Sequence, residues 1–269
     1  MITLLLTLAA GGCVFATANW AVDMGLGWSI FMGVAGAAVS QILAGIFIQK
    51  RVKRDMESVQ AVLVEGQKKL QAKMQRWQMR PPGSLQAAQK EIAADTQVFV
   101  KEALARTGVL EKYRRWVPMM DRQIATARLQ LSWMIKDFRA VDALMPKALL
   151  IDPTMAAIKM SRMQMTGADI GEIRKLYRKA SSRVRYNQNV LLAAAMSWIE
   201  IKRGDVDGAF KTLTEALKKS DNETLKQNHA HLMNNRPAHF SNSGLGEQWY
   251  SLLLEEPKVR MQRQRQAFR

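Results

Sequence analysis

The hydrophobic residues of this chain follow three different patterns in three successive stretches. Residues 1–49 are apolar almost without interruption and contain one charged residue, Asp23. From Val52 to Trp77 the apolar residues recur at alternating spacings of four and three, which is the heptad pattern of a coiled coil. Residues 109–256 show helical periodicity interrupted by short turns, with no alternating strand pattern. Together these patterns predict an all-α protein.

The first stretch contains two apolar runs, Ile2 to Val22 and Trp28 to Ile48, joined by a connector at 23–27. Each run of 21 residues would form a helix about 31 Å long, which matches a hydrocarbon core of about 30 Å. The glycines of the connector permit a tight reversal of the chain. We therefore predict a transmembrane helical hairpin over 1–49, with proteolytic processing of the first segment as the alternative.

Basic residues begin immediately after the second apolar run. Those that we expect to contact lipid headgroups are Lys50, Arg51, Lys53 and Arg54. The connector has no base, so the positive-inside rule predicts that both termini and the rest of the chain are cytoplasmic. The predicted location is a bacterial inner membrane or an equivalent one.

Residues 50–80 are predicted to form a long basic amphipathic stalk. Its apolar stripe consists of Val52, Met56, Val59, Leu63, Gly66, Leu70, Met74 and Trp77. The stripe either pairs with another copy of the chain or packs on the molecule's own helices, and Gly66 weakens the case for pairing. Residues 81–84, which contain two prolines, are predicted to be a linker. Ser84 is the expected N-cap of a helix from Leu85 to about Arg106.

Small residues on the second apolar run leave a further route to self-association open. Gly33, Ala37 and Gly45 recur every four positions on one face, together with Gln41. Such a face allows close packing either with the first helix or with another copy in the membrane. A homo-oligomer formed through the stalk or the hairpin is therefore one of the partners considered.

A repeated frame organises the rest of the chain. Each copy begins with an aspartate, at Asp137, Asp169 and Asp205, followed at offsets of four, eight and eleven by buried-type residues. The copy after Asp205 consists of Ala209, Leu213 and Ala216. An aspartate at the start of a helix can cap free backbone N–H groups. A period of thirty to forty residues built from helix pairs is typical of a helical solenoid.

The run from Gly204 to Ala216 resembles the second half of a tetratricopeptide repeat (TPR), and 147–153 resembles the end of such a repeat, including Pro153. The similarity extends over about residues 122–220, but the first helices depart from the family, as with Glu200 at the position of a tyrosine. The resemblance implies a TPR-like α-solenoid of about three helix pairs within 85–256, acting as a binding scaffold.

In this family the first helix of each unit lines the concave face of the solenoid. The partner-binding residues that the resemblance implies are Gln130, Trp133, Arg162, Met165, Trp198 and Lys202. Alternatively, the two tryptophans are buried spacers. The two cations are the stronger candidates, because long cations are rarely buried unpaired, and they would suit an acidic segment of a partner.

The net positive charge of the chain suggests a second functional hypothesis. The chain of 269 residues has 40 Lys and Arg against 23 Asp and Glu, a formal net charge of +17, and ends in a basic tail at 257–269. Such an excess favours anionic lipid or nucleic acid. Nucleic acid is the less expected partner, because the tail offers Phe268 as its one aromatic residue for stacking.

No catalytic or cofactor-binding pattern emerges. Cys13 is the only cysteine, and His229 and His231 point to different faces of a helix, so neither a metal site nor a disulfide is expected. Residues 243–246 contain an isolated Gly-x-Gly, which more closely suits a turn before a last helix at 247–256. The favoured hypothesis is a membrane-anchored, non-enzymatic adaptor without a cofactor, and the partner protein is not identified.

Overall fold

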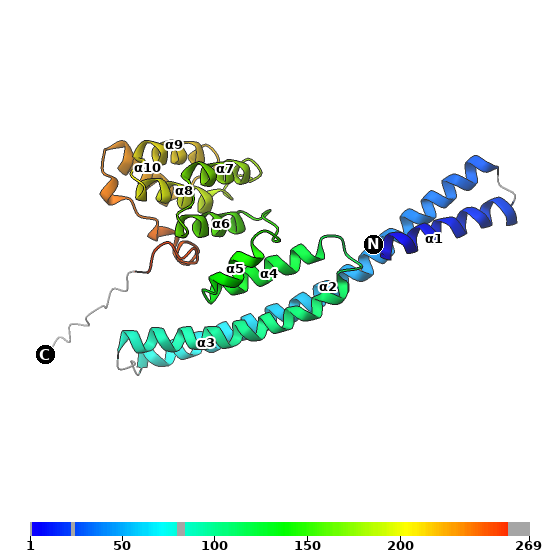
Figure 1. Cartoon of the computed structure of the whole chain (residues 1–269), viewed down its shortest axis with the longest axis horizontal. Coiled ribbons are helices and arrows are strands. Elements are labelled where there is room, and N and C mark those ends of the chain that lie inside the picture. Colours follow the sequence, from blue (N-terminus) through cyan, green and yellow to red (C-terminus); the bar gives the residue numbers. More distant parts are fainter. Residues whose placement is uncertain (1, 23–24, 80–83, 258–269) are drawn as a thin grey trace. The chain divides into compact units, whose positions relative to one another are not determined.

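A computed structural model of the chain describes residues 2–22, 25–79 and 84–257, shown in Figure 1. The chain forms two compact units, Met1–Ala148 and Leu149–Arg269. The described residues form helices and their connections, with no β-strand among them. The all-α prediction is therefore confirmed. The boundary between the units falls inside the range 85–256 assigned above to one repeat domain.

The first unit begins with two apolar helices. α1 spans Ile2–Ala16 and continues into a π-helical turn, Thr17–Ala21, while α2 spans Leu26–Met79. A Cβ atom on Gly11 would lie 2.7 Å from that of Ala37, and one on Gly33 would lie 2.9 Å from that of Phe15. These pairings make the two helices antiparallel neighbours (Figure 1). Gly33 and Ala37 of the second run thus engage α1 within the same chain, whereas nothing lies within 4 Å of a Cβ atom added at Gly45.

Both helices are long and apolar enough to cross a membrane by length and composition. Their large apolar side chains are mostly exposed, and Trp20 reaches 85%. The others include Leu4, Leu5, Leu6, Leu8, Trp28, Phe31, Val34, Val39, Ile42, Leu43, Ile46 and Phe47. Water-soluble proteins rarely expose an apolar surface of this extent. Residues 23 and 24 of the connector lie outside the described residues.

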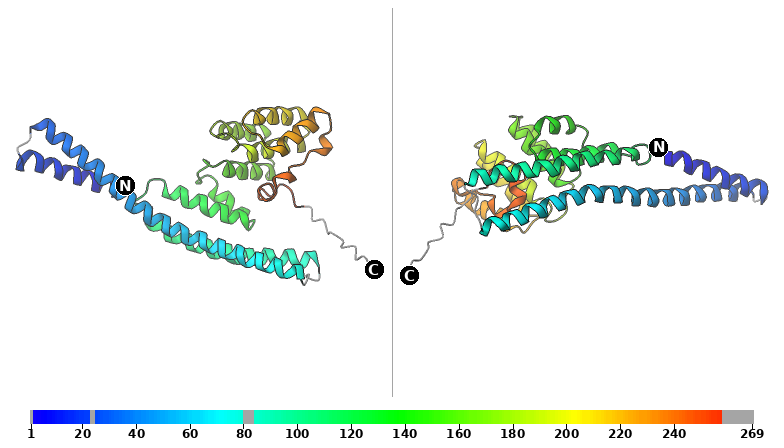
Figure 2. Two further views of the ribbon diagram at one scale, coloured as in Figure 1. Left: turned by 180° about the vertical axis from the view of Figure 1, so that it is seen from behind. Right: turned by 90° about the horizontal axis from the view of Figure 1, so that it is seen from below.

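The second half of α2 packs against α3, Leu85–Arg106. The two helices run alongside each other (Figure 2). Val59 and Val62 of α2 form a buried cluster with Phe99, Val100 and Ala103 of α3, and Leu63 and Leu70 pack at its edge. The apolar stripe of the stalk is therefore covered within the chain as far as Leu70, in line with the second of the two interpretations, whereas Met74 is exposed.

The packing of α3 on α2 explains why residue 66 is a glycine. A Cβ atom at this position would lie 2.4 Å from the ring of Phe99, so only glycine lets the aromatic ring contact the α2 backbone. The expected start of α3 is confirmed, because the Ala87 amide donates a hydrogen bond to the Ser84 hydroxyl (3.1 Å). Of the predicted linker, 81–83 lies outside the described residues.

The rest of the first unit returns along α2. A 3₁₀ segment, Thr107–Tyr113, leads to α4, Met120–Met134, and to the short helix α5, Phe138–Leu144. A second buried cluster joins Leu110, Tyr113, Met120 and Ile124, with Ile48, Val52 and Met56 of α2 packed against it. The first residues of the stalk stripe, Val52 and Met56, are partly buried here.

The second unit consists of helices in close succession. They are α6 (Pro153–Met165), α7 (Ile170–Ser181), α8 (Val190–Lys202), α9 (Val206–Leu217) and α10 (Glu223–Met233). Each contacts the next, and α6 also contacts α8 (Figure 1). Residues 192–200 of α8 are buried without a break. This central helix therefore forms the core of the unit.

The three aspartates of the repeat frame cap helices as expected. Asp137 accepts a hydrogen bond from the Ala140 amide (3.1 Å) at the start of α5, and Asp169 accepts one from Gly171 (2.7 Å) at the start of α7. Asp205 accepts one from Gly208 (2.8 Å) at the start of α9. The residues four and eight positions after each aspartate are all buried.

The end of the chain differs from the expectation of a helix over 247–256. α11 spans only Glu247–Tyr250, and the chain then turns, with Leu253 at a φ of 57°. Trp249 and Leu252 are fully buried, whereas Leu253 and Leu254 are half-buried. The left-handed residue ends helical geometry, which the apolar pattern alone did not reveal.

Candidate functional site

The six residues expected on a partner-binding face are divided between the two units. Gln130 is exposed on α4, while Trp133 on the same helix is buried and lies edge-on to Phe138 (ring centroids 5.6 Å apart). Trp133 thus fits the interpretation of a buried spacer. In the second unit, Arg162 and Met165 lie on α6, and the remaining two lie on α8.

Trp198 is covered by the end of its own chain. Its indole Nε1 donates a hydrogen bond to Oε1 of Glu255 (2.8 Å), and Nε1 of Trp249 donates to Oε2 of the same carboxylate (2.8 Å). The two indole rings meet edge-on, with centroids 5.9 Å apart. Trp198 is therefore a structural residue of α8, since residues 249–255 occupy the side that a partner would need.

Some of the other predicted partner-binding side chains of this unit are accessible, and two of them are positively charged. Lys202 is exposed, with its ammonium 5.2 Å from the centre of the Trp198 ring. On α6, which contacts α8, Arg162 is half-buried and Met165 is exposed. These three side chains are the part of the predicted face in the second unit that remains accessible.

A charged network that the sequence did not reveal lies in the same unit. Glu200 of α8 is 2% exposed; it accepts hydrogen bonds from Nε of Arg174 on α7 (2.9 Å) and from the hydroxyl of Thr212 on α9 (2.8 Å). Arg174 also pairs with Asp205. Burial raises the pKa of Glu200, while the hydrogen bonds from Thr212 and Arg174 oppose the shift. The sequence signal for this network was the single acidic residue in the mostly apolar helix α8.

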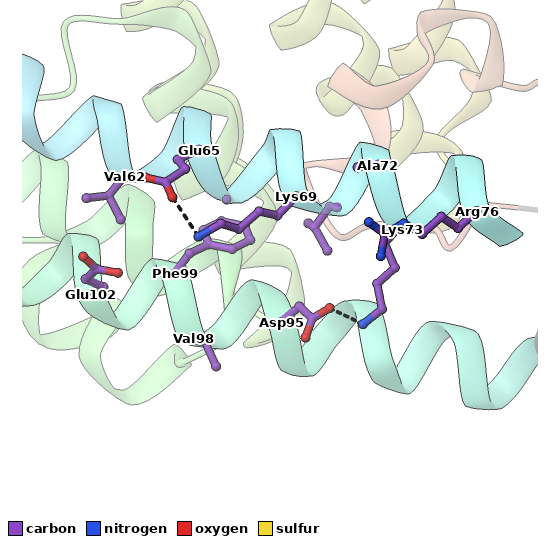
Figure 3. Close-up of a pocket in the computed structure, with 12 residues that line it drawn as sticks. Val62, Glu65, Lys69, Ala72, Lys73, Arg76, Asp95, Val98, Phe99 and Glu102 are labelled. Atoms are coloured by element: carbon purple, nitrogen blue, oxygen red, sulfur yellow. Dashed lines mark hydrogen bonds and ion pairs between the residues drawn. The ribbon is translucent and has the colours of Figure 1, made fainter.

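A groove of about 720 Å³ follows the α2–α3 pair in the first unit (Figure 3). Lys73 of α2 bridges Asp95 and Glu91 of α3, at 2.5 Å each, and these hydrogen bonds raise its pKa. Lys69 pairs with Glu65 at 2.7 Å on its own helix. Part of the stalk's positive charge is therefore neutralised by acids of the same unit, which weakens the stalk as a surface for nucleic acid.

The four bases expected at lipid headgroups are all exposed on α2. Lys53 lies 4.0 Å from Glu57, and the guanidinium of Arg51 lies 4.5 Å above the centre of the Phe47 ring. Lys50 and Arg54 occupy the same two turns of the helix. The bases thus follow directly on the exposed apolar half of α2.

Asp55, one residue beyond these bases, fastens α2 to the 3₁₀ segment. Its Oδ2 accepts a hydrogen bond from the Tyr113 hydroxyl (2.8 Å) and pairs with the ammonium of Lys112 (2.8 Å). The bond from Lys112, with that from Tyr113, holds the pKa of Asp55 below its ordinary value. This ion pair places Lys112 beside the bases that follow the apolar half of α2.

The histidines form pairs that do not assemble a metal site. His229 stacks on Phe210 (centroids 4.6 Å apart), and its Nε2 lies 3.0 Å from the Thr214 hydroxyl. His231 stacks on His239, with centroids 5.6 Å apart. Within the described ranges, no three His, Cys, Asp or Glu side chains gather as metal ligands would.

Comparisons of the chain with protein-family models, with curated proteins and with solved structures found no match.

Proposed function

We propose that this protein is a membrane-anchored scaffold: a transmembrane hairpin carries a TPR-like helical domain that binds a protein partner at the cytoplasmic face. The observation that supports the anchor is α2 itself. Its first half exposes large apolar side chains, and its second half is built into the core of a folded unit. One continuous helix thus joins a membrane-compatible segment to a folded segment.

The recognition part of the proposal rests on the helix pairs with aspartate caps. The frame residues four and eight positions after each aspartate are buried and structural, so we assign binding to the accessible side chains of the preceding helices. In the second unit these are Arg162, Met165 and Lys202, which suit an acidic segment of the partner. No enzymatic activity and no cofactor form part of the proposal.

The second candidate function is electrostatic binding of an anionic surface. Pairing of Lys69 and Lys73 with acids disfavours nucleic acid along the stalk, whereas the exposed bases that follow the apolar half of α2 favour anionic lipid. The basic tail after Pro257 lies outside the described residues. Lipid contact is compatible with the scaffold role and is treated as part of it.

The test uses the full-length chain in its native membrane, with a photo-crosslinking amino acid in place of Met165. We expect a discrete crosslinked protein, and we expect its yield to fall severalfold when R162Q and K202Q are added. The matched control, K175Q with K179Q, removes two exposed charges of α7 and should leave the yield unchanged. Equal yields in all three proteins, or background labelling only, would reject this recognition face.

A further inference from the structure

A pocket lies where the apolar half of α2 meets its basic half. Its volume is about 570 Å³. One end is lined by the apolar side chains of Ala44, Phe47 and Ile48, which belong to the last turns of the second apolar run. The other end is lined by Arg51, Arg54 and Lys112. The pocket therefore changes from apolar to cationic along the direction of the helix.

Two distant parts of the chain complete this pocket. Tyr113 and Trp116 line it from the segment that follows α3. The Tyr113 ring is buried in the cluster with Leu110 and Ile124, and the Trp116 carbonyl accepts a hydrogen bond from the hydroxyl of Thr3, at the start of α1 (3.3 Å). The wall that faces α2 is thus held by the folded core and by the first helix.

The charges of the pocket favour an anion. Its three bases face a single acid, Asp55, and that carboxylate is already engaged by Lys112 and by the Tyr113 hydroxyl. The ammonium of Lys112 is also positioned 5.0 Å from the centre of the Tyr113 ring. Arginine and lysine side chains are the usual partners of phosphate oxygens in proteins. A group with one negative charge would still leave the pocket positive.

We propose that this pocket binds one anionic glycerophospholipid, with its phosphate at Arg51, Arg54 and Lys112 and an acyl chain along Ala44 and Ile48. The inference rests on the proposed membrane anchor, which brings the pocket to the level of the headgroups. An aromatic residue such as Trp116 is common at that level, because its ring is apolar and its N–H is polar. A soluble phosphate compound would use only the cationic end.

The chain provides a matched comparison for this site. Arg51 and Arg54 line the pocket, whereas Lys50 and Lys53, offset by one residue, do not. R51Q with R54Q and K50Q with K53Q therefore remove the same charge from the same turns of α2. General attraction to an anionic surface would respond equally to both pairs. A third variant, A44F, fills the apolar end and changes no charge.

The experiment is lipid retention by the full-length protein in detergent, measured by native mass spectrometry during titration with phosphatidylglycerol or phosphatidylcholine. We expect one tightly retained phosphatidylglycerol and at least tenfold weaker retention of phosphatidylcholine. R51Q with R54Q should weaken phosphatidylglycerol retention about tenfold, A44F severalfold, and K50Q with K53Q no more than about twofold. Excess glycerol phosphate should not displace the lipid, because it lacks the acyl chain.

Equal losses in the two charge pairs, or no preference between the two lipids, would overturn the inference. Displacement by glycerol phosphate at the concentration of the lipid would overturn the lipid assignment in favour of a soluble phosphate compound. Carbonate extraction of native membranes provides the separate readout of the anchor. All variants are expected to stay in the membrane pellet; wild-type protein in the supernatant would reject the anchor itself, irrespective of lipid retention.

Discussion

Glu200 differs from the tyrosine of the tetratricopeptide pattern, and in the structure it takes part in the packing of three helices. An ionised carboxylate is costly to bury unless charged or polar donors surround it. Here Arg174 and Thr212 supply those donors from the helices on either side, so that α7, α8 and α9 are joined at one carboxylate. The residue therefore serves helix packing, and a role in partner recognition is not needed to explain it.

Removal of Arg174 should make the second unit pH-sensitive. In R174M the buried Glu200 loses its cation, so its already raised pKa rises further. A carboxyl group whose folded pKa is raised stabilises the fold at low pH, and that stability is lost as pH rises through the folded pKa. We expect a loss of about 3 kcal/mol near pH 8 and a smaller loss near pH 5. Hydrogen exchange of α8 and α9 at the two pH values measures it.

The same exchange measurement on R174M with E200Q provides the control. Glutamine cannot ionise, so the difference between the two pH values should disappear in the double variant. A loss in R174M that is equal at pH 5 and pH 8 would contradict the assignment of Glu200 as the titrating group.

At the scale of the element, α2 is the helix on which the first unit is assembled. Most of its apolar stripe is covered by the same chain: α3 covers one section and the 107–124 segment covers another. Gly66 lies at a close contact between the α2 backbone and α3 in this packing. In sequence it is a weak position in a heptad seam, whereas in the fold it receives the ring of Phe99.

Substitution of Gly66 tests this packing directly. G66A places a methyl group against the buried Phe99 ring, and we expect it to lower the free energy of unfolding by about 2 kcal/mol despite the better helix propensity of alanine. The control is G45A in the same helix, where nothing lies within 4 Å of the added atom. Urea unfolding in mild detergent gives both values. Equal stability of the two variants would argue against close α2–α3 packing.

At the scale of the whole molecule, charge and apolar surface are separated along the chain. The 40 basic residues all follow the second apolar run, and the exposed apolar side chains of α1 and the first half of α2 precede them. For the proposed membrane anchor, the positive-inside rule predicts an orientation with these bases on the cytoplasmic side. The folded part of the chain that follows the second apolar run is then predicted to lie on that side as well.

This orientation predicts the accessibility of engineered cysteines. After C13A, a cysteine at Gly25 should react with a membrane-impermeant maleimide added to intact cells, because the connector faces outward. A cysteine at Lys90, on α3, should react only after the membrane is permeabilised. Labelling at position 90 and protection at position 25 would reverse the proposed orientation.

Local interactions account for what could be read from the sequence. Ser84 and the aspartates at 137, 169 and 205 start helices because a cap needs only backbone groups two or three residues away. The all-α class and the apolar end followed by bases are likewise properties of composition and period. The transmembrane and TPR-like interpretations of these patterns stay predictions.

Tertiary structure decided the features that depend on which distant segments meet. The apolar stripe of a heptad pattern can be covered by another copy of the chain or by other helices of the same chain. Only the contacts with α3 and with the 107–124 segment distinguish these two alternatives. The cover of Trp198 by Glu255, the partners of Glu200 and the completion of the basic pocket by Lys112 likewise join residues far apart in sequence. Periodicity along one helix determines which face is apolar, but the identity of what covers that face follows from the packing of the whole unit.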